Sequence, residues 1–286
     1  MMGIMNSQVK KMACAANLLA AVAASALLGS FSAQADTVLN LTASPYSASD
    51  NQGSFFARTD VQPTGTGVIK PFLTIQQKGT EHGYNTDSTN TALLLDDHRA
   101  PSAWVRSVSM DEIAAVTVAG KTGLYAQFLL DINETNNDGH LLSMDKLQLF
   151  WTTDPNITGY HETSFTQGMA TDGFANATKI YDLDKTIDYR VDLDYSFNHG
   201  SGSGDMYAFI PYAVIQAQLS QNKYLVMYSS FGVPDTSSAG FEEWSVMTGS
   251  HPPVGAPPEV PLPTTALSGV ILLGSLGFCQ RSRKKN

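Results

Sequence analysis

The sequence predicts an all-β protein with a single antiparallel β-sandwich or jelly-roll-like domain, a signal peptide before it and a short transmembrane-like tail after it. Three observations predict this organisation. Apolar and polar residues alternate with period two, short apolar runs are separated by Gly, Asn and Asp turn signals, and both ends of the chain pair an apolar run with a basic cluster.

The first 35 residues have the order of a secretory signal peptide. Lys10 and Lys11 supply the positive region, an apolar run follows over 15–31, and Ala33-Gln34-Ala35 gives a small-x-small cleavage site. We therefore expect signal peptidase to cut between Ala35 and Asp36, and the domain to occupy residues 36–247.

The body of the chain is strongly acidic and lacks cysteine. Residues 36–263 contain all 26 acidic residues but 11 of the 17 basic ones, so the net charge of this span is −15. Such a charge excludes binding to nucleic acid by bulk electrostatics. The two cysteines, Cys14 and Cys279, lie outside this span. A disulfide, a thiolate nucleophile and a cysteine metal site are therefore excluded from the body.

The clearest strand signal runs from Tyr181 to Phe197. Its odd positions are apolar except for Lys185, while its even positions are mostly polar, with aspartates at Asp182, Asp184, Asp188, Asp192 and Asp194. Period-two alternation predicts two strands near 179–184 and 188–198, joined as a hairpin at Lys185-Thr186. The aspartates would then share one face, which is either a solvated surface or a cation-binding one.

Other short apolar runs between turn signals complete the predicted sheets. Strands are expected over 68–77, 113–120, 124–133, 141–151, 205–210 and 223–232, and a short helix is expected over 213–222. Turn signals include Gly120-Lys121-Thr122-Gly123 and Asn137-Asp138-Gly139. Many short strands with close turns favour a sandwich or jelly roll.

The composition changes after Thr248. Residues 248–263 hold six of the 13 prolines, which predicts an extended linker. An apolar run over 266–278 follows, too short for the roughly 20 residues of a full membrane span. The chain then carries a basic cluster of Arg281, Arg283, Lys284 and Lys285.

The C-terminal order resembles a PEP-CTERM sorting signal over residues 260–286. Val260-Pro261-Leu262-Pro263 precedes an apolar run with spaced glycines and the basic cluster, although Leu262 stands where the name-giving motif has Glu. The resemblance implies export in a Gram-negative bacterium, passage through the inner membrane and recognition by an exosortase. It also implies a final place at the cell surface or in the extracellular matrix, with a link to exopolysaccharide. The phrases FLTIQQKGTEHGYNTD, FLLDINE, GSGSGDM and GFEEW likewise resemble uncharacterised PEP-CTERM proteins.

A second possible sorting signal overlaps the first. Leu262-Pro263-Thr264-Thr265-Ala266 resembles the LPxT-type sortase signal, with Ala for the usual Gly. This alternative implies cell-wall anchoring. The double proline and the glycine-spaced apolar run favour the exosortase signal.

The segment from Glu134 to Asp145 offers the best candidate metal site. Glu134, Asn136 and Asp138 stand at alternate positions, Gly139 follows, and Asp145 is twelfth, an order typical of calcium loops. Calcium is therefore the candidate cofactor. The alternative is a plain hairpin turn at Asn137-Asp138-Gly139.

No catalytic motif emerges from the chain. The six histidines lack metal spacing, and Gly200-Ser201-Gly202-Ser203-Gly204-Asp205 lacks the Lys of a phosphate loop. Glu242-Glu243 beside Trp244 would suit a sugar site, or Trp244 is a buried residue of the last strand. The sequence thus favours a non-enzymatic surface or matrix protein. The alternatives are a glycan-active enzyme and a calcium-dependent carbohydrate-binding or adhesive module.

Overall fold

A computed structural model describes the body of the chain with short gaps. The described residues are 36–59, 69–90, 95–96, 103–134, 139–161, 172–198, 204–217, 223–238 and 240–247. The predicted signal peptide, the predicted linker, the tail apolar run, the basic cluster and the VPLP motif fall outside these ranges.

The first sheet has seven strands and is antiparallel except for one pair. Its order is β1-β12-β10-β14-β6, with β11 also beside β10 and β7 beside β14. β1 runs parallel to β12. The strands are β1 (Thr37–Asn40), β6 (Glu81–Tyr84), β7 (Val108–Ser109), β10 (Leu141–Thr152), β11 (Thr178–Asp182), β12 (Tyr189–Asp194) and β14 (Tyr224–Phe231).

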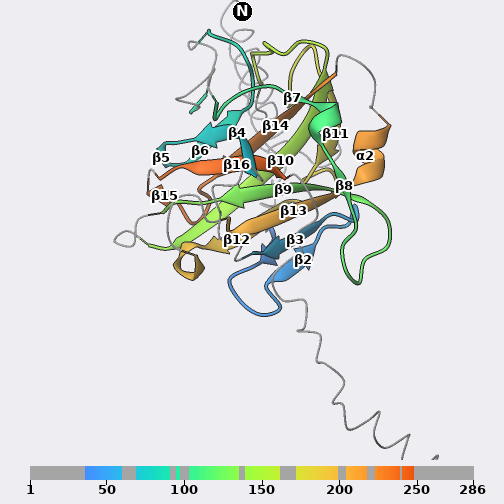
Figure 1. Ribbon diagram of the computed structural model, residues 1–286. Coiled ribbons are helices and arrows are strands. Elements are labelled where there is room, and N and C mark those ends of the chain that lie inside the picture. The colour runs from blue at the N-terminus through green and yellow to red at the C-terminus, as the bar shows by residue number, and fades with distance from the viewer. Residues whose placement is uncertain are drawn as a thin grey trace, which may run out of the picture. The chain divides into compact units, whose positions relative to one another are not determined.

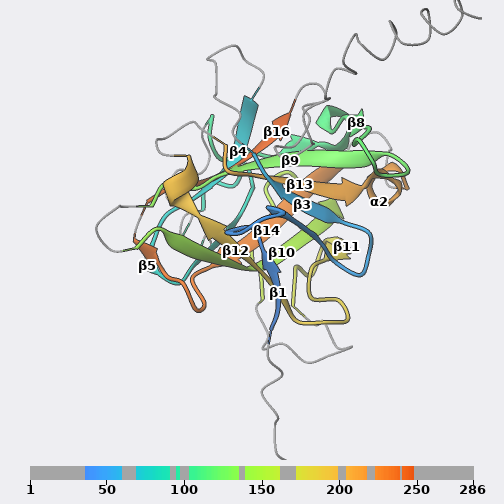
Figure 2. The same cartoon turned by 90° about the horizontal axis from the view of Figure 1, so that it is seen from below.

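The second sheet also has seven strands, all paired antiparallel. Its order is β2-β3-β13-β9-β16-β4, with β8 beside β9. The strands are β2 (Ser47–Ser49), β3 (Phe55–Arg58), β4 (Ile69–Ile75), β8 (Ala115–Val116), β9 (Tyr125–Asp131), β13 (Met206–Pro211) and β16 (Glu242–Met247). Figure 1 labels these strands, and Figure 2 shows the two sheets as separate layers.

Small elements complete the described fold. β5 (Lys78–Gly79) and β15 (Ser237–Ser238) pair with each other in a two-stranded ribbon, which we call the end ribbon. The helical segments are η2 (Met110–Glu112), η3 (Tyr195–Phe197) and α2 (Tyr212–Gln216). The capping of η2 is local, because the Ser109 hydroxyl accepts the Asp111 N–H and the Glu112 carboxylate accepts the Ser109 N–H.

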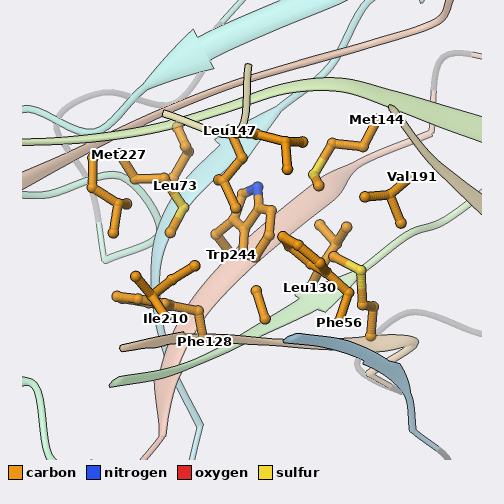
Figure 3. Packing of buried hydrophobic residues seen from close by; sticks show 14 of the residues in the cluster. Phe56, Leu73, Phe128, Leu130, Met144, Leu147, Val191, Ile210, Met227 and Trp244 are labelled. Atoms are coloured by element: carbon orange, nitrogen blue, oxygen red, sulfur yellow. The ribbon is translucent and has the colours of Figure 1, made fainter. Parts of the chain in front are cut away.

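The largest apolar cluster draws its side chains from both sheets. Trp244 of β16 lies at its centre, among Leu73 and Leu130 of the second sheet and Leu147 and Met227 of the first (Figure 3). The Trp244 indole is fully buried, and its N–H donates to the Ser229 hydroxyl at 3.0 Å. Burial between the layers is therefore the contact that joins the two sheets.

The predicted all-β class is confirmed, and the longest predicted strands are present. The expected runs 68–77, 124–133, 141–151, 205–210 and 223–232 correspond to β4, β9, β10, β13 and β14. The predicted helix is present as α2, but the strand expected over 113–120 is limited to β8. Period-two alternation is visible in β12, where Tyr189, Val191 and Leu193 are buried in the core cluster.

Two predicted hairpins are wrong. β11 and β12 do not pair with each other but lie end to end along β10, opposite residues 148–151 and 141–144. The turn at Lys185-Thr186 therefore separates two strands that run in the same direction along β10, and it does not reverse the chain. The hairpin at Asn137-Asp138-Gly139 is also absent, because β9 belongs to one sheet and β10 to the other. Turn residues signal a change of direction without specifying whether the next strand pairs with the last.

We expect the loss of the Trp244 side chain to destabilise the fold strongly. Trp244→Ala removes the side chain at the centre of the core, and such changes cost about 3–5 kcal/mol. Urea unfolding measures the difference. Trp104→Ala is the matched control, because Trp104 is 44% exposed and should cost much less. Equal losses for the two variants would contradict the placement of Trp244.

Candidate functional site

The four residues of the predicted calcium loop are not brought together by the described contacts. Asn136 and Asp138 lie outside the described residues. Glu134 is buried, and its Oε2 accepts the Ser238 N–H at 2.7 Å. Asp145 Oδ2 accepts the Val233 N–H at 3.1 Å. Glu134 and Asp145 thus hold different parts of the segment after β14, and calcium binding stays a prediction.

Trp244 cannot form the sugar platform that the sequence offered as one interpretation. Its indole is 0% exposed and packed between the sheets, so no ligand can stack on it. The alternative, a buried tryptophan in the last strand, is confirmed. Glu242 lies two residues before Trp244 and shares its inward face, whereas Glu243 faces outward, where its Oε1 accepts from the Thr74 hydroxyl at 3.4 Å.

Three glutamates instead meet beside the end ribbon. Glu81 of β6, Glu134 after β9 and Glu242 of β16 form what we call the glutamate cluster. Their exposed fractions are 1%, 3% and 0%. The Glu242 carboxyl lies in hydrogen-bonding contact with the carboxyls of both Glu81 and Glu134. Strands from both sheets thus deliver acidic side chains to one buried point.

Strand register explains why two of these acids point inward. Glu81 stands opposite Phe231, which belongs to the core cluster, and Glu242 alternates with Trp244. The third acid, Glu134, follows β9, and the backbone at Gly240 packs closely against this segment. A Cβ on Gly240 would lie 1.5 Å from the carbonyl oxygen of Asn133, so a side chain there is excluded.

The glutamate cluster has few hydrogen-bond donors. Glu81 Oε2 accepts the Gln77 N–H at 2.7 Å, and Glu134 Oε2 accepts the Ser238 N–H. Glu81 Oε1, Glu134 Oε1 and both oxygens of Glu242 are buried without a donor. Within the described ranges, no lysine, arginine or histidine forms an ion pair with these glutamates.

Burial therefore favours the neutral form of Glu81 and Glu242. Burial raises the pKa of Glu242 well above its ordinary value, and the neighbouring carboxyls of Glu81 and Glu134 raise it further. Burial also raises the pKa of Glu81, against the lowering effect of its hydrogen bonds to Glu242 and Gln77. Glu81 and Glu242 therefore keep their protons to a higher pH than an exposed glutamate does.

A small pocket lies elsewhere, between the ends of β3 and β12, and we call it the Arg58 pocket. Its volume is about 10 Å³, and its lining residues are Leu41, Arg58, Leu193, Asp194, Phe197 and Asp205. The Arg58 guanidinium carbon lies 3.7 Å from the Phe197 ring centroid and 5.0 Å from that of Tyr46. Two aromatic rings therefore hold the cation in place. Tyr46 itself adopts a left-handed φ of 56°.

Two polar atoms of this pocket are buried without hydrogen-bond partners, Arg58 Nε and Asp205 Oδ1. The other oxygen, Asp205 Oδ2, accepts the Ile132 N–H at 2.8 Å. Burial, together with a smaller contribution from the charge of Asp131, raises the pKa of Asp205 to about 9, so this carboxyl is protonated at neutral pH. A volume of about 10 Å³ admits one water-sized group, such as a hydroxyl, and excludes a sugar ring.

The predicted aspartate face is not a uniformly solvated surface. Asp182 and Asp184 are 5% and 8% exposed. Asp182 accepts from Lys179 at 2.7 Å, and Asp184 accepts the Tyr189 N–H at 3.0 Å. Burial raises the pKa of Asp184 to about 8. On β12, Asp192 pairs with Arg190 at 2.9 Å. The solvated-face prediction is therefore wrong for Asp182 and Asp184.

Sequence reasoning did not identify Arg58 or Glu81, and it treated Asp205 as part of a loop motif. The one available signal for an inward Glu242 was its position two residues before Trp244, because side chains two positions apart in a strand point to the same face. Nothing in the sequence shows which inward acids will meet, because Glu81 and Glu242 are 161 positions apart.

Searches for metal sites and membrane spans gave no candidates within the described ranges. No group of three or more His, Cys, Asp or Glu there has the arrangement of a metal site. No helix in the same residues is both long and apolar enough to cross a membrane. No protein-family model matches the chain, and comparison with curated proteins and with solved structures gave no match.

We expect stability to fall as the pH rises. Asp184 and Asp205 have pKa values of about 8 and about 9 in the fold, above the ordinary aspartate value near 4. The folded state therefore binds more protons, and the stability is lost as the pH rises through the folded values. The slope is at most about 1.4 kcal/mol per pH unit for each group.

Urea unfolding between about pH 5 and about pH 9 tests this linkage. Asp205→Asn should flatten the dependence, because its side chain cannot ionise. Asp111→Asn is the matched control, since Asp111 is exposed, and it should keep the wild-type slope. An unchanged slope in Asp205→Asn would show that Asp205 is ionised in the fold.

The calcium prediction has its own test. Calcium at millimolar concentration should raise the melting temperature of the wild type, because a ligand that binds the folded state stabilises it by about 2.7 kcal/mol at 100 times its dissociation constant. Asp138→Asn and Asp145→Asn should each weaken the shift, whereas Asp111→Asn should not. A melting temperature that calcium leaves unchanged would remove the predicted site.

Proposed function

We propose that the protein is an exported, non-enzymatic surface or matrix protein that an exosortase processes and that associates with exopolysaccharide. One observation carries this proposal, the C-terminal order of the VPLP motif, a short apolar run and a basic cluster. An N-terminal segment with a small-x-small cleavage site supports it.

The extent of the described strands is consistent with this proposal. β1 begins at Thr37, one residue after Asp36, the predicted mature start, and β16 ends at Met247, before the Pro-rich linker. In the proposal, the two sheets form a single β-sandwich, jelly-roll-like domain that export delivers as a folded unit. The linker then separates this domain from the sorting signal.

The Arg58 pocket offers hydrogen-bond donors to a single hydroxyl-sized group. A protonated Asp205 can donate a hydrogen bond, Arg58 Nε is a second donor, and a ligand hydroxyl can accept from either. Glycans present many such hydroxyls. The paired carboxylates of the chain's glutamate cluster are enclosed, whereas a glycosidase needs its two carboxyls on either side of a substrate cleft.

Mapping both termini of the mature protein from its native host tests the proposal. We expect the chain to begin at Asp36 and to end near Pro263, because the exosortase is expected to act near this motif. Intact mass and terminal peptides measure both ends. An end at Thr265 would favour the LPxT sortase alternative. A tail retained to Asn286 would contradict exosortase processing.

A matched pair of double variants sharpens this test. Pro261→Ala with Pro263→Ala changes the sorting motif and should leave the tail uncut. Pro257→Ala with Pro258→Ala changes the same residue type in the linker and should be processed as the wild type. Equal processing of both variants would show that the VPLP motif is not recognised.

A further inference from the structure

The Arg58 pocket is lined by elements of both sheets. Arg58 is the last residue of β3 in the second sheet, and Asp205 directly precedes β13 of the same sheet. Leu193 and Asp194 end β12 of the first sheet, and η3 follows them with Phe197 as its last residue. All five residues line the pocket. It therefore exists only once the two sheets have come together.

Main-chain hydrogen bonds hold the two polar groups of the pocket in place. The Arg58 N–H donates to the Tyr46 carbonyl at 2.9 Å, and the Thr59 N–H donates to the Asp205 carbonyl at 2.8 Å. The guanidinium also lies against two aromatic rings, and Asp205 Oδ2 accepts a main-chain N–H. Both side chains are thus oriented before any ligand arrives, which lowers the entropic cost of binding.

Phe197 adds an apolar surface that the fold also holds in place. At the start of η3, the Asp194 carboxylate accepts the Ser196 N–H at 2.8 Å. At its end, the Asn198 side chain donates to the Gly204 carbonyl at 2.8 Å. Phe197 is nevertheless 38% exposed, even though a guanidinium carbon lies 3.7 Å from its ring centroid. An exposed ring therefore stands directly beside a polar pocket.

The unpartnered atoms of the pocket define the group that fits. Arg58 Nε can only donate, and Asp205 Oδ1 has no hydrogen-bond partner among the described residues. A hydroxyl satisfies both atoms, because its oxygen accepts from Nε–H while it donates to Oδ1 or accepts from Oδ1–H. The fit does not depend on the charge of Asp205. An acetamido group or a methyl ether is too large for a volume of about 10 Å³.

The charges around the pocket favour a neutral ligand. Asp194 and Asp205 both line it, against the single cation of Arg58, and residues 36–263 carry a net charge of −15. A carboxylate on a ligand would meet these acids and would lack a hydrogen to donate. Neutral sugars combine unsubstituted hydroxyls with an apolar ring face that can lie against an aromatic side chain.

We propose that the Arg58 pocket and the Phe197 ring together form a subsite for one neutral sugar unit of a polysaccharide. One unsubstituted hydroxyl of this sugar occupies the pocket, between Arg58 Nε and Asp205 Oδ1, and the apolar face of its ring lies against Phe197. The subsite rests on the association with exopolysaccharide proposed above and names its ligand class. Uronic acid units and sugars whose hydroxyls are all methylated or acetylated are excluded.

Native electrophoresis of the full chain in gels that contain a polysaccharide tests the subsite. The neutral probes are dextran, a mixed-linkage β-glucan and a galactomannan, and the acidic probe is polygalacturonate. We expect at least one neutral polymer to retard the protein, and its O-methylated form and polygalacturonate to have no effect. Lack of retardation by every neutral polymer would overturn the subsite. Equal retardation by the methylated polymer or by polygalacturonate would overturn it as well.

Two variants with matched controls assign the binding to this pocket. Arg58→Lys keeps the positive charge without Nε, so affinity should fall at least about tenfold, as expected for a lost hydrogen bond to a charged group. Phe197→Leu keeps an apolar side chain without the ring and should weaken binding about two- to tenfold. Arg106→Lys and Trp104→Leu remove a guanidinium and an exposed ring outside the pocket and should bind as the wild type does.

The outcomes separate this subsite from the proposed function. Wild-type retardation that both pocket variants retain would overturn the subsite and leave the association with polysaccharide standing, as would a loss confined to Trp104→Leu. Fractionation of the native host shows separately whether the protein is found with the extracellular polysaccharide. If thermal melting shows that Arg58→Lys does not fold, Phe197→Leu decides, because an exposed side chain contributes less to the stability of the core.

Discussion

Apolar burial between the two sheets is the interaction on which the rest of this structure depends. The described residues contain no cysteine, so no disulfide joins the layers, and the apolar core cluster is the main contact between them. Trp244 is central to this contact because it is the largest buried side chain. Its inward position fixes the parity of β16 and therefore also places Glu242 inside the protein.

Buried acidic side chains of this domain are accommodated in two different ways, by ion pairing and by protonation. At Asp172 and Asp182, Lys179 Nζ lies 2.7 Å from both carboxylates. Burial raises the pKa of Asp172, but the hydrogen bonds from Lys179 and Gln148 and the charges of Lys179 and Lys146 together outweigh it, so the pKa is lowered. In the glutamate cluster no such cation is present among the described residues, so protonation takes its place. The first arrangement favours charged acids and the second favours neutral ones.

This difference between charged and neutral buried acids matters for a domain that is proposed to be exported. An exported domain meets an external pH that the cell does not set. The ion-paired aspartates keep their contacts at alkaline pH, because their charged form is the bonded one. The glutamate cluster, Asp184 and Asp205 respond in the opposite sense, since their neutral form is the bonded one. We therefore expect the response to alkaline pH at Glu81, Glu242, Asp184 and Asp205, which are buried carboxyls outside the apolar cluster.

The local pattern of apolar and polar residues was enough to predict many of the strands. Alternation over 181–197 identified β11 and β12 and their buried residues, and the absence of cysteine in the body required a core held by burial. The predicted signal peptide and the predicted C-terminal sorting signal are likewise recognised from the order of residues in the sequence. Their processing stays a prediction. These features depend on neighbours in the chain, so the sequence alone carries them.

Tertiary structure decided which strands pair and which acids meet. The turn at Lys185-Thr186 looked like a hairpin, yet β11 and β12 both lie along β10, and β9 and β10 separate into different sheets. Glu81, Glu134 and Glu242 come together because three distant segments converge beside the end ribbon. Pairing between distant strands depends on how whole faces bury one another, a property of the assembled sheets that no local stretch of residues specifies.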